Sequence, residues 1–295
     1  MVKTRNTILL LIVFTQAIFA QDQTSYSPGD SLQYLHIPAR PANAIEGSAF
    51  VAQLTGMGIE YRETAILREI LSGNVPSFSR KLRSIKINQT IDTEDFELIY
   101  FTTLDYMAIG SDRDYLYVPL TPASAQYLAD TLNCSLPTKR IVDKIYAISD
   151  IKLSPQPIPP SDTMTTISVF EQHTDSILLQ LSLLRFDRST NSIVAGHKKD
   201  IIISNKIYDA DINCDRVVIY GWHLSEDNPI QPVYNGHIAR YADYSHAVRL
   251  ISKVAFINGA PFHTDTILRD PRLSILLSDE GVIRKPFYPK ASSGL

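Results

Sequence analysis

The side chains best suited to chemistry are concentrated between Gly196 and Arg249, where four of the seven histidines and the only tryptophan lie. Imidazole can act as a general base, and flat rings beside polar groups are what a sugar- or peptide-binding cleft needs. The residues that we expect to line such a cleft are Trp222, His223, His237, Tyr241, Tyr244, Ser245 and Arg249. Histidine and tyrosine also pack at strand ends, which is the alternative for each of them.

Cys134 is the candidate nucleophile. It lies in a turn just before a helix expected to begin near Thr138, and Lys139 and Arg140 follow. The positive end of the helix dipole and the two nearby cations both favour the thiolate form of a cysteine. The position of Cys134 therefore favours nucleophilic catalysis.

A cysteine hydrolase also requires a histidine base that is oriented by a third polar group. We expect His246 in this role, because Asp243 and other polar residues crowd around it in the sequence, and His197 is the second candidate. Two alternatives remain for Cys134. It could form a disulfide with Cys214 after export, or it could be an inert buried thiol.

A metal site is a further possibility for the same histidines. Catalytic zinc usually has three protein ligands, which His223, His237 and His246 or Asp243 could supply if the fold brings them together. The sequence has no H-E-x-x-H and no C-x-x-C motif. We therefore expect no metal and no cofactor.

The first twenty residues have the layout of a secretory signal peptide. Lys3 and Arg5 give a positive start, residues 8–14 form an apolar run, and Ala20 is the small residue at the expected cleavage site. We therefore expect a secreted or periplasmic protein. A formal charge of -3 gives no reason to expect nucleic acid as a partner, and no later stretch approaches the roughly 20 apolar residues of a transmembrane helix.

Local patterns predict an α+β fold with a linker or loose arm at residues 21–40 and a single domain at 41–295. Helices are expected in the N-terminal two thirds, at residues 46–54, 60–72, 122–132, 138–149 and 172–184. Strands are expected at 82–87, 96–101, 116–118 and 163–170. The C-terminal third is predicted to be a mostly antiparallel β meander, with strands at 199–204, 216–222, 246–251 and 253–257.

The helix at residues 60–72 has the clearest apolar periodicity. Its expected buried stripe consists of Tyr61, Ile66, Leu67, Ile70 and Leu71.

Two stretches resemble papain-like amidohydrolases of the NlpC type, which cleave peptide bonds in bacterial cell walls. In that family a Cys-Ser pair opens a helix and a Gly-His pair starts a following strand. Cys134-Ser135 and Gly196-His197 match those pairs. The chain departs from the pattern at Leu136-Pro137, where a small residue would continue the helix start.

Two other resemblances are to exported bacterial proteins. Residues 245–250 (SHAVRL) are similar to a signature of L,D-transpeptidases, although the cysteine of that signature has no counterpart here. A larger part of the chain resembles a group of uncharacterised secreted bacterial proteins. The stretches that carry this resemblance are residues 109–112 (IGSD), 134–138 (C-x-L-P-T), 196–200 (GHKKD), 220–223 (YGWH) and 243–246 (DYSH).

Together these features predict an exported cysteine hydrolase that cleaves peptide or amide bonds in cell wall or a similar extracellular polymer. The alternative is a non-catalytic module that binds wall glycan or peptide through an aromatic and histidine cleft. A metal-dependent hydrolase is the third possibility.

Overall fold

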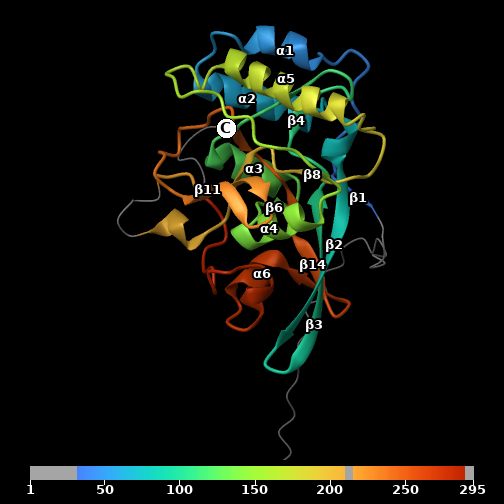
Figure 1. The fold of residues 1–295 in the computed structure, drawn as a ribbon, viewed down its shortest axis with the longest axis vertical. Helices are drawn as coiled ribbons and strands as arrows, with labels where there is room; N and C mark the ends of the chain where they lie inside the picture. Colours follow the sequence, from blue (N-terminus) through green and yellow to red (C-terminus); the bar gives the residue numbers. More distant parts are fainter. Residues whose placement is uncertain (1–31, 210–214, 290–295) are drawn as a thin grey trace, which may run out of the picture.

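A long hairpin forms the central part of the larger sheet. In the computed structural model, which describes residues 32–209 and 215–289, β2 (Lys81–Ile91) and β3 (Glu94–Thr103) pair antiparallel along their length. Asp92 and Thr93 join them with φ values of 48° and 71°. Positive φ at both central residues is what a type I′ turn requires. The tip of this hairpin projects from the body of the molecule (Figure 1).

Short strands from the N-terminal, middle and C-terminal parts of the chain extend this hairpin into a sheet of seven strands. The order is β1-β2-β3-β13-β6, and β14 pairs with both β3 and β15. Their bounds are β1 (Gln33–Tyr34), β6 (Cys134–Ser135), β13 (Ile251–Ser252), β14 (Val254–Ile257) and β15 (Ala260–His263). Because β13 and β14 occupy its second edge, β3 lies inside the sheet and its last six residues are buried.

A second sheet brings together separate parts of the C-terminal half, in the order β11-β10-β9-β12. Its strands are β9 (Lys199–Ile201), β10 (Ile219–Ser225), β11 (Asn228–Tyr234) and β12 (His246–Ala247). β9 pairs antiparallel with β10 and parallel with β12. Two smaller ladders are formed by β4 (Ala108–Gly110) with β5 (Tyr115–Tyr117), and by β7 (Ile151–Lys152) with β8 (Val194–Ala195).

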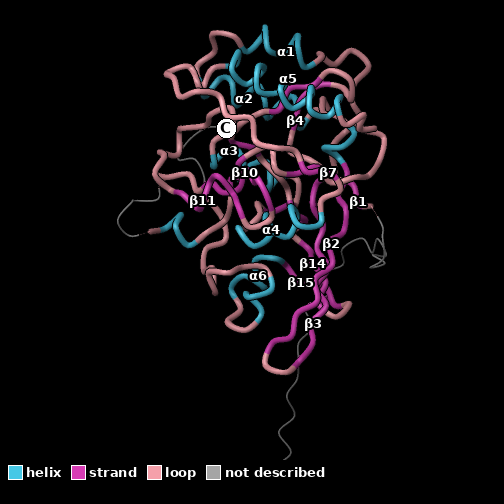
Figure 2. The backbone as a smooth tube through the Cα atoms, viewed as in Figure 1, coloured by secondary structure: helices cyan, strands magenta, loops and turns pink. Residues whose placement is uncertain are grey.

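Helices cluster at the end of the molecule opposite the hairpin tip (Figure 2). This group consists of α1 (Gly47–Leu54), α2 (Ile59–Leu71) and α5 (Ile167–Leu183). The other helices are α3 (Pro122–Thr131), α4 (Lys139–Ile148), α6 (Thr264–Arg269) and the 3-10 helices η1 (Ser77–Arg80), η2 (Asn205–Tyr208) and η3 (Leu273–Leu276). Thr138 caps α4, because its hydroxyl accepts the N–H of Ile141 at 3.3 Å.

The expected α+β arrangement, with helices in the N-terminal two thirds and a β meander in the C-terminal third, is wrong. Strands begin at β1 and include the longest hairpin, while α6 and η3 lie in the last third. In the C-terminal third, β9, β10 and β11 pair with their sequence neighbours, as do β14 and β15, but the strands do not continue as one meander. β13 and β14 join β3, and β12 joins β9 in parallel. The strand expected at 163–170 is also wrong, because α5 begins at Ile167.

The N-terminal predictions fall only partly within the described residues. The expected signal peptide lies outside them. Within the expected arm at 21–40, Gln33 and Tyr34 pair with β2, and Leu35 and Ile37 are buried. This part of the arm is packed on the sheet. In the described part of the chain, no helix combines the length and apolar character needed to cross a bilayer.

Candidate functional site

The parallel pairing of β12 with β9 builds the site, because it places His246 opposite Lys199. A turn before β12 holds Asp243 beside them. The carboxylate of Asp243 accepts the backbone N–H of Ser245 at 2.8 Å and its hydroxyl at 2.5 Å. This is the Asx turn that aspartate favours at a chain reversal. The turn therefore fixes a carboxylate next to the buried His246.

Aromatic rings lead from the surface towards His246. Tyr234 and His237 are 5.1 Å apart between ring centroids, and His237 stacks on Tyr241 at 4.2 Å. Tyr241 lies 5.8 Å from His246. Tyr234 is 43% exposed, His237 and Tyr241 are half-buried, and His246 is fully buried. We call Tyr234, His237 and Tyr241 the aromatic row.

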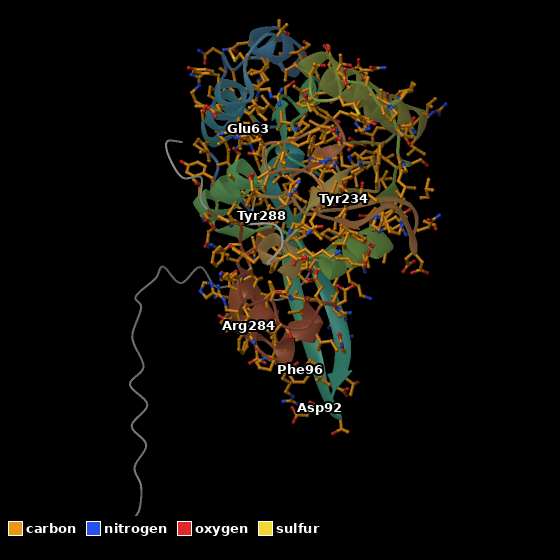
Figure 3. All side chains as sticks on the ribbon, turned by 90° about the vertical axis from the view of Figure 1, so that its left-hand side faces the viewer. Glu63, Asp92, Phe96, Tyr234, Arg284 and Tyr288 are labelled. Atoms are coloured by element: carbon orange, nitrogen blue, oxygen red, sulfur yellow. The ribbon has the colours of Figure 1, made fainter. Side chains whose placement is uncertain are left out.

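The aromatic row is on the outside of the molecule, away from both of its ends. Figure 3 shows Tyr234 near the middle, between the helical end that carries Glu63 and the hairpin tip at Asp92. The hydroxyl of Tyr241 donates to Asp243 at 3.1 Å, which fixes the inner ring of the row. The row is thus a surface that continues into the Asp243 turn.

Electrostatics keep Asp243 charged and His246 neutral. Burial alone would raise the pKa of Asp243, but attraction to His246 and the hydrogen bonds from Ser245 lower that pKa to about 2. Burial lowers the pKa of His246 to about 4, against the attraction of Asp243. The two side chains approach to 4.0 Å, but near neutral pH the ring of His246 is uncharged and makes no ion pair. Within the described residues neither ring nitrogen of His246 has a hydrogen-bond partner.

His197 belongs to a different cluster in the interior. Its Nε2 lies 3.2 Å from Oδ1 of Asp105, and its ring packs between Tyr106 and Tyr117. Arg188 donates to the other oxygen of Asp105 at 2.6 Å. Burial raises the pKa of Asp105, but Arg188 and His197 outweigh it and hold the pKa well below its usual range. This expected base is therefore enclosed in the interior beside Asp105, and within the described residues neither of its ring nitrogens has a hydrogen-bond partner.

Arg249 is also internal, although we expected it in a cleft. It donates to the carbonyls of Thr103 and Val194 at 2.9 and 2.7 Å, and its guanidinium lies 4.2 Å from the ring centroid of Tyr106. Asp200 is 3.9 Å away. Arg249 thus connects β3, β8 and β9 and is 1% exposed.

Three other expected binding residues are packing residues in the structure. Trp222 donates to the carbonyl of His197 at 3.1 Å, and the hydroxyl of Tyr244 bonds to the backbone of Ile158. His223 lies 3.2 Å from Asp143, and its ring stacks on Tyr146 of α4 at 4.5 Å. Trp222, Tyr244 and His223 are each at most 5% exposed.

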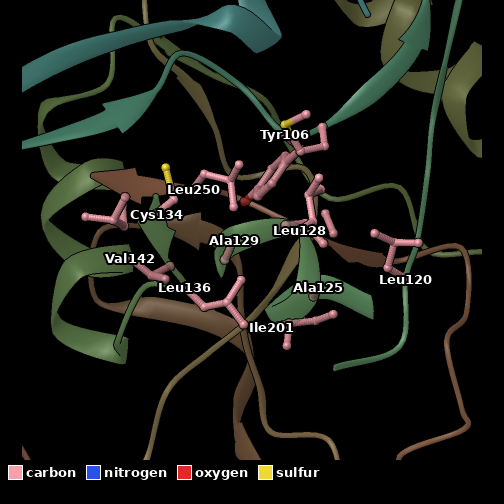
Figure 4. Close-up of a cluster of buried hydrophobic side chains, with 14 of the residues drawn as sticks. Tyr106, Leu120, Ala125, Leu128, Ala129, Cys134, Leu136, Val142, Ile201 and Leu250 are labelled. Carbon is pink, nitrogen blue, oxygen red and sulfur yellow. The ribbon is translucent and has the colours of Figure 1, made fainter. Parts of the chain in front are cut away.

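Cys134 is remote from these groups. It lies on β6 among apolar side chains that include Leu136, Val142 and Leu250 (Figure 4), and it is a free thiol that is 1% exposed. Its sulfur donates to the carbonyl of Leu132 at 3.4 Å. Burial raises the pKa of the thiol to about 12. Thr138, not Cys134, occupies the start of α4. Cys214 lies outside the described residues.

A groove next to the aromatic row was not foreseen from the sequence. Its volume is about 670 Å³, and Tyr241 forms part of its wall. The other lining residues are Leu54, Thr55, Gly56, Met57, Ile59, Arg62, Thr165, Thr166, Ile167, Ser168, Ile238 and Arg240. Arg62 is buried on α2, whereas Tyr61, which we expected in the buried stripe, is 78% exposed. One feature of the sequence indicates that this face is buried. Arg62 lies four residues before Ile66, so the two side chains lie on the same face of the helix.

Neither a metal site nor similarity to a known protein helps to assign a function to these residues. Over residues 32–209 and 215–289, no group of three or more histidine, cysteine, aspartate or glutamate side chains could hold a metal ion. Comparison of the chain with protein-family models, curated proteins and solved structures gives no match.

Proposed function

We propose that the chain is a binding module for an extracellular glycan-containing polymer, such as bacterial cell wall, and that the aromatic row is its contact surface. The observation that carries the proposal is the continuous run of three rings, Tyr234, His237 and Tyr241, from the surface to the Asp243 turn. Sugar rings present apolar faces to aromatic side chains, and a few directed hydrogen bonds then fix their orientation.

A polar group suited to that second task is next to the row. Lys199 is partly exposed and lies 4.7 Å from the ring centroid of Trp222. Asp243 keeps a charged carboxylate at the inner end of the row, where Tyr241 contacts it. The ammonium of Lys199 can donate to sugar hydroxyls, whereas Asp243, which is 2% exposed, holds Tyr241 in place. The expected export after Ala20 would bring the chain to such a polymer.

The geometry gives less support to a cysteine hydrolase. That mechanism needs a thiolate within reach of a histidine, and Cys134 has a raised pKa and a backbone carbonyl as its hydrogen-bond partner. The two histidines expected as bases, His197 and His246, are both fully buried in other clusters. A binding module without catalytic activity requires neither a thiolate nor a histidine base beside it.

The test compares binding of purified wall and of soluble N-acetylglucosamine oligomers to wild type, Tyr234→Ala and Tyr127→Ala. Loss of one stacking ring is expected to weaken oligomer binding about three- to tenfold, as measured by calorimetry. Tyr127 is the matched control, because it is as exposed as Tyr234, at 43%, but lies on α3.

Two results would contradict the proposal. One is wild-type protein that binds neither wall nor oligomers. The other is equal weakening by Tyr234→Ala and Tyr127→Ala, since only Tyr234 belongs to the aromatic row. Release of soluble products from wall by the wild type, lost in Cys134→Ala, would favour the hydrolase instead.

A further inference from the structure

The groove beside Tyr241 contains a buried cation, Arg62, that forms no ion pair with a carboxylate in the part of the chain that the structure describes. Arg62 is 6% exposed, and its Nη1 donates to the carbonyl of Thr165 at 2.8 Å. Its guanidinium also lies 5.0 Å from the ring centroid of Phe170. Its Nε is buried without an acceptor in the part of the chain that the structure describes. A buried charge without a partner is costly, so an acceptor at this position would be strongly favoured.

The carboxylate of Glu63, next to Arg62 in sequence, attracts the guanidinium but is turned away from it. Glu63 accepts the backbone N–H and the hydroxyl of Thr121, both at 2.6 Å, and also the hydroxyl of Ser124. These bonds hold the carboxylate of Glu63 towards α3. No ion pair to Arg62 is found among residues 32–209 and 215–289.

The positive end of α5 opens on the same groove. Thr166 precedes the helix without a side-chain cap to the first turn, and that turn contains no acidic residue. The first helical hydrogen bond is from Phe170 to Thr166. The backbone N–H groups of residues 167–169 therefore have no acceptor within the described chain. Free N–H groups and the helix dipole make such a terminus attractive to anions.

The remaining charges of the groove have the same sign. Arg240 lines the rim and is 79% exposed, with only a loose contact of 3.7 Å to the exposed Glu60. No acidic residue is among those that line the groove. The end of α1 also borders it, but the carbonyls of Val51 and Leu54 already accept bonds from Thr55 and Met57.

We propose that this groove is a subsite for an anionic group, a carboxylate or a phosphate, held by Arg62, Arg240 and the N-terminus of α5. Because Tyr241 belongs to both surfaces, the anionic group would be carried by the ligand that lies along the aromatic row. Only this last step rests on the proposed function. Small anions would occupy the groove whatever the polymer is.

The test titrates the purified chain with inorganic phosphate and with glucuronic acid, which distinguishes the two possible anions. Both are monitored by calorimetry and by NMR of the backbone N–H groups of α5. Arg62→Gln is expected to weaken binding of the preferred anion about tenfold or more, and Arg240→Gln about threefold. Arg68→Gln is the control, because Arg68 is exposed on α2 and does not line the groove.

Equal anion binding in wild type, Arg240→Gln and Arg62→Gln would overturn the subsite, as would no binding of either anion. If Arg62→Gln does not fold, the Arg240→Gln variant still tests the subsite, because Arg240 is exposed. Neutral N-acetylglucosamine oligomers separate the two proposals. Their binding should depend on Tyr234 and not on Arg240. Anion binding without oligomer binding would reject the proposed function alone, and the reverse result would reject the subsite alone.

Discussion

At the scale of single residues, the fold combines a charged Asp243 with a neutral His246 a few ångströms apart. The two side chains differ in the hydrogen bonds that offset the cost of burying them. The Asp243 carboxylate receives hydrogen bonds from Ser245 and Tyr241, whereas the ring nitrogens of His246 have no hydrogen-bond partner within the described residues. Lys198, Lys199 and His237 also face His246 and oppose its protonation. His246 should therefore stay neutral until the solution is well below neutral pH.

Acid should destabilise the fold through His246. Burial lowers the pKa of this imidazole to about 4, while an imidazole in an unfolded chain titrates near about 6.5. Between these values the unfolded chain binds a proton that the folded chain excludes, so the free energy of unfolding falls as the pH falls. For His246 alone the loss reaches about 2–3 kcal/mol at the lower end of the window.

Urea denaturation between about pH 7 and about pH 4.5 measures this loss. His246→Gln removes the titrating group, so its free energy of unfolding should change less with pH than that of the wild type. His36→Gln is the control because His36 is exposed, and it should follow the wild type. The same pH dependence in His246→Gln and wild type would contradict the assignment.

The second prediction at this scale concerns Cys134. Its thiol is 1% exposed and burial raises its pKa to about 12, so little thiolate exists at neutral pH. In a Cys214→Ser background, we expect Cys134 to react with a thiol-specific disulfide reagent only as fast as the chain opens. The same variant in urea should react rapidly. Rapid reaction of the folded variant would instead restore Cys134 as a candidate nucleophile.

At the scale of elements, the turn of the β2–β3 hairpin requires positive φ at a residue type that disfavours it. Thr93 has a φ of 71°, which is unfavourable for a β-branched residue. Asp92 has a φ of 48°, which aspartate tolerates better. The turn is set by the two long strands that it joins, and these pair along their whole length.

Thr93→Gly should therefore stabilise the protein. Glycine adopts positive φ without the steric cost of threonine, and this gain exceeds the entropy that glycine adds to the unfolded chain. We expect an increase of about 0.5–1 kcal/mol in the free energy of unfolding. Thr90→Gly, within β2, should lower it. Thermal denaturation of both variants measures the difference, and a lower stability for Thr93→Gly would contradict the argument.

Helices were predicted better than strand pairing, because helix signals are local. Residues 60–72 and 122–132 were expected as helices and correspond to α2 and α3. The expectation that Tyr61 is buried is wrong, because its neighbours Arg62 and Glu63 are buried instead, Arg62 against Phe170 of α5 and Glu63 against Thr121. Periodicity does not show that a charged residue will find distant partners inside the fold.

At the scale of the whole molecule, buried charges connect parts that are distant in sequence. Arg188 contacts Asp105, Arg249 contacts the carbonyl of Thr103, and Lys198 donates to the carbonyl of Tyr244 at 2.6 Å. Such contacts form only when segments that are far apart in the sequence have come together. This explains why local sequence patterns indicate a polar segment at 241–246 but do not indicate its pairing with β9.

The single tryptophan has an optical consequence. Trp222 lies on β10 with its ring near His173, Tyr244 and Lys199, and the chain contains no other indole. When the protein is excited at wavelengths that tryptophan alone absorbs, all of its fluorescence therefore comes from Trp222. This ring lies beside the inner end of the aromatic row. Emission from the unlabelled wild type reports from that one location, so ligand titrations can be followed there without a dye.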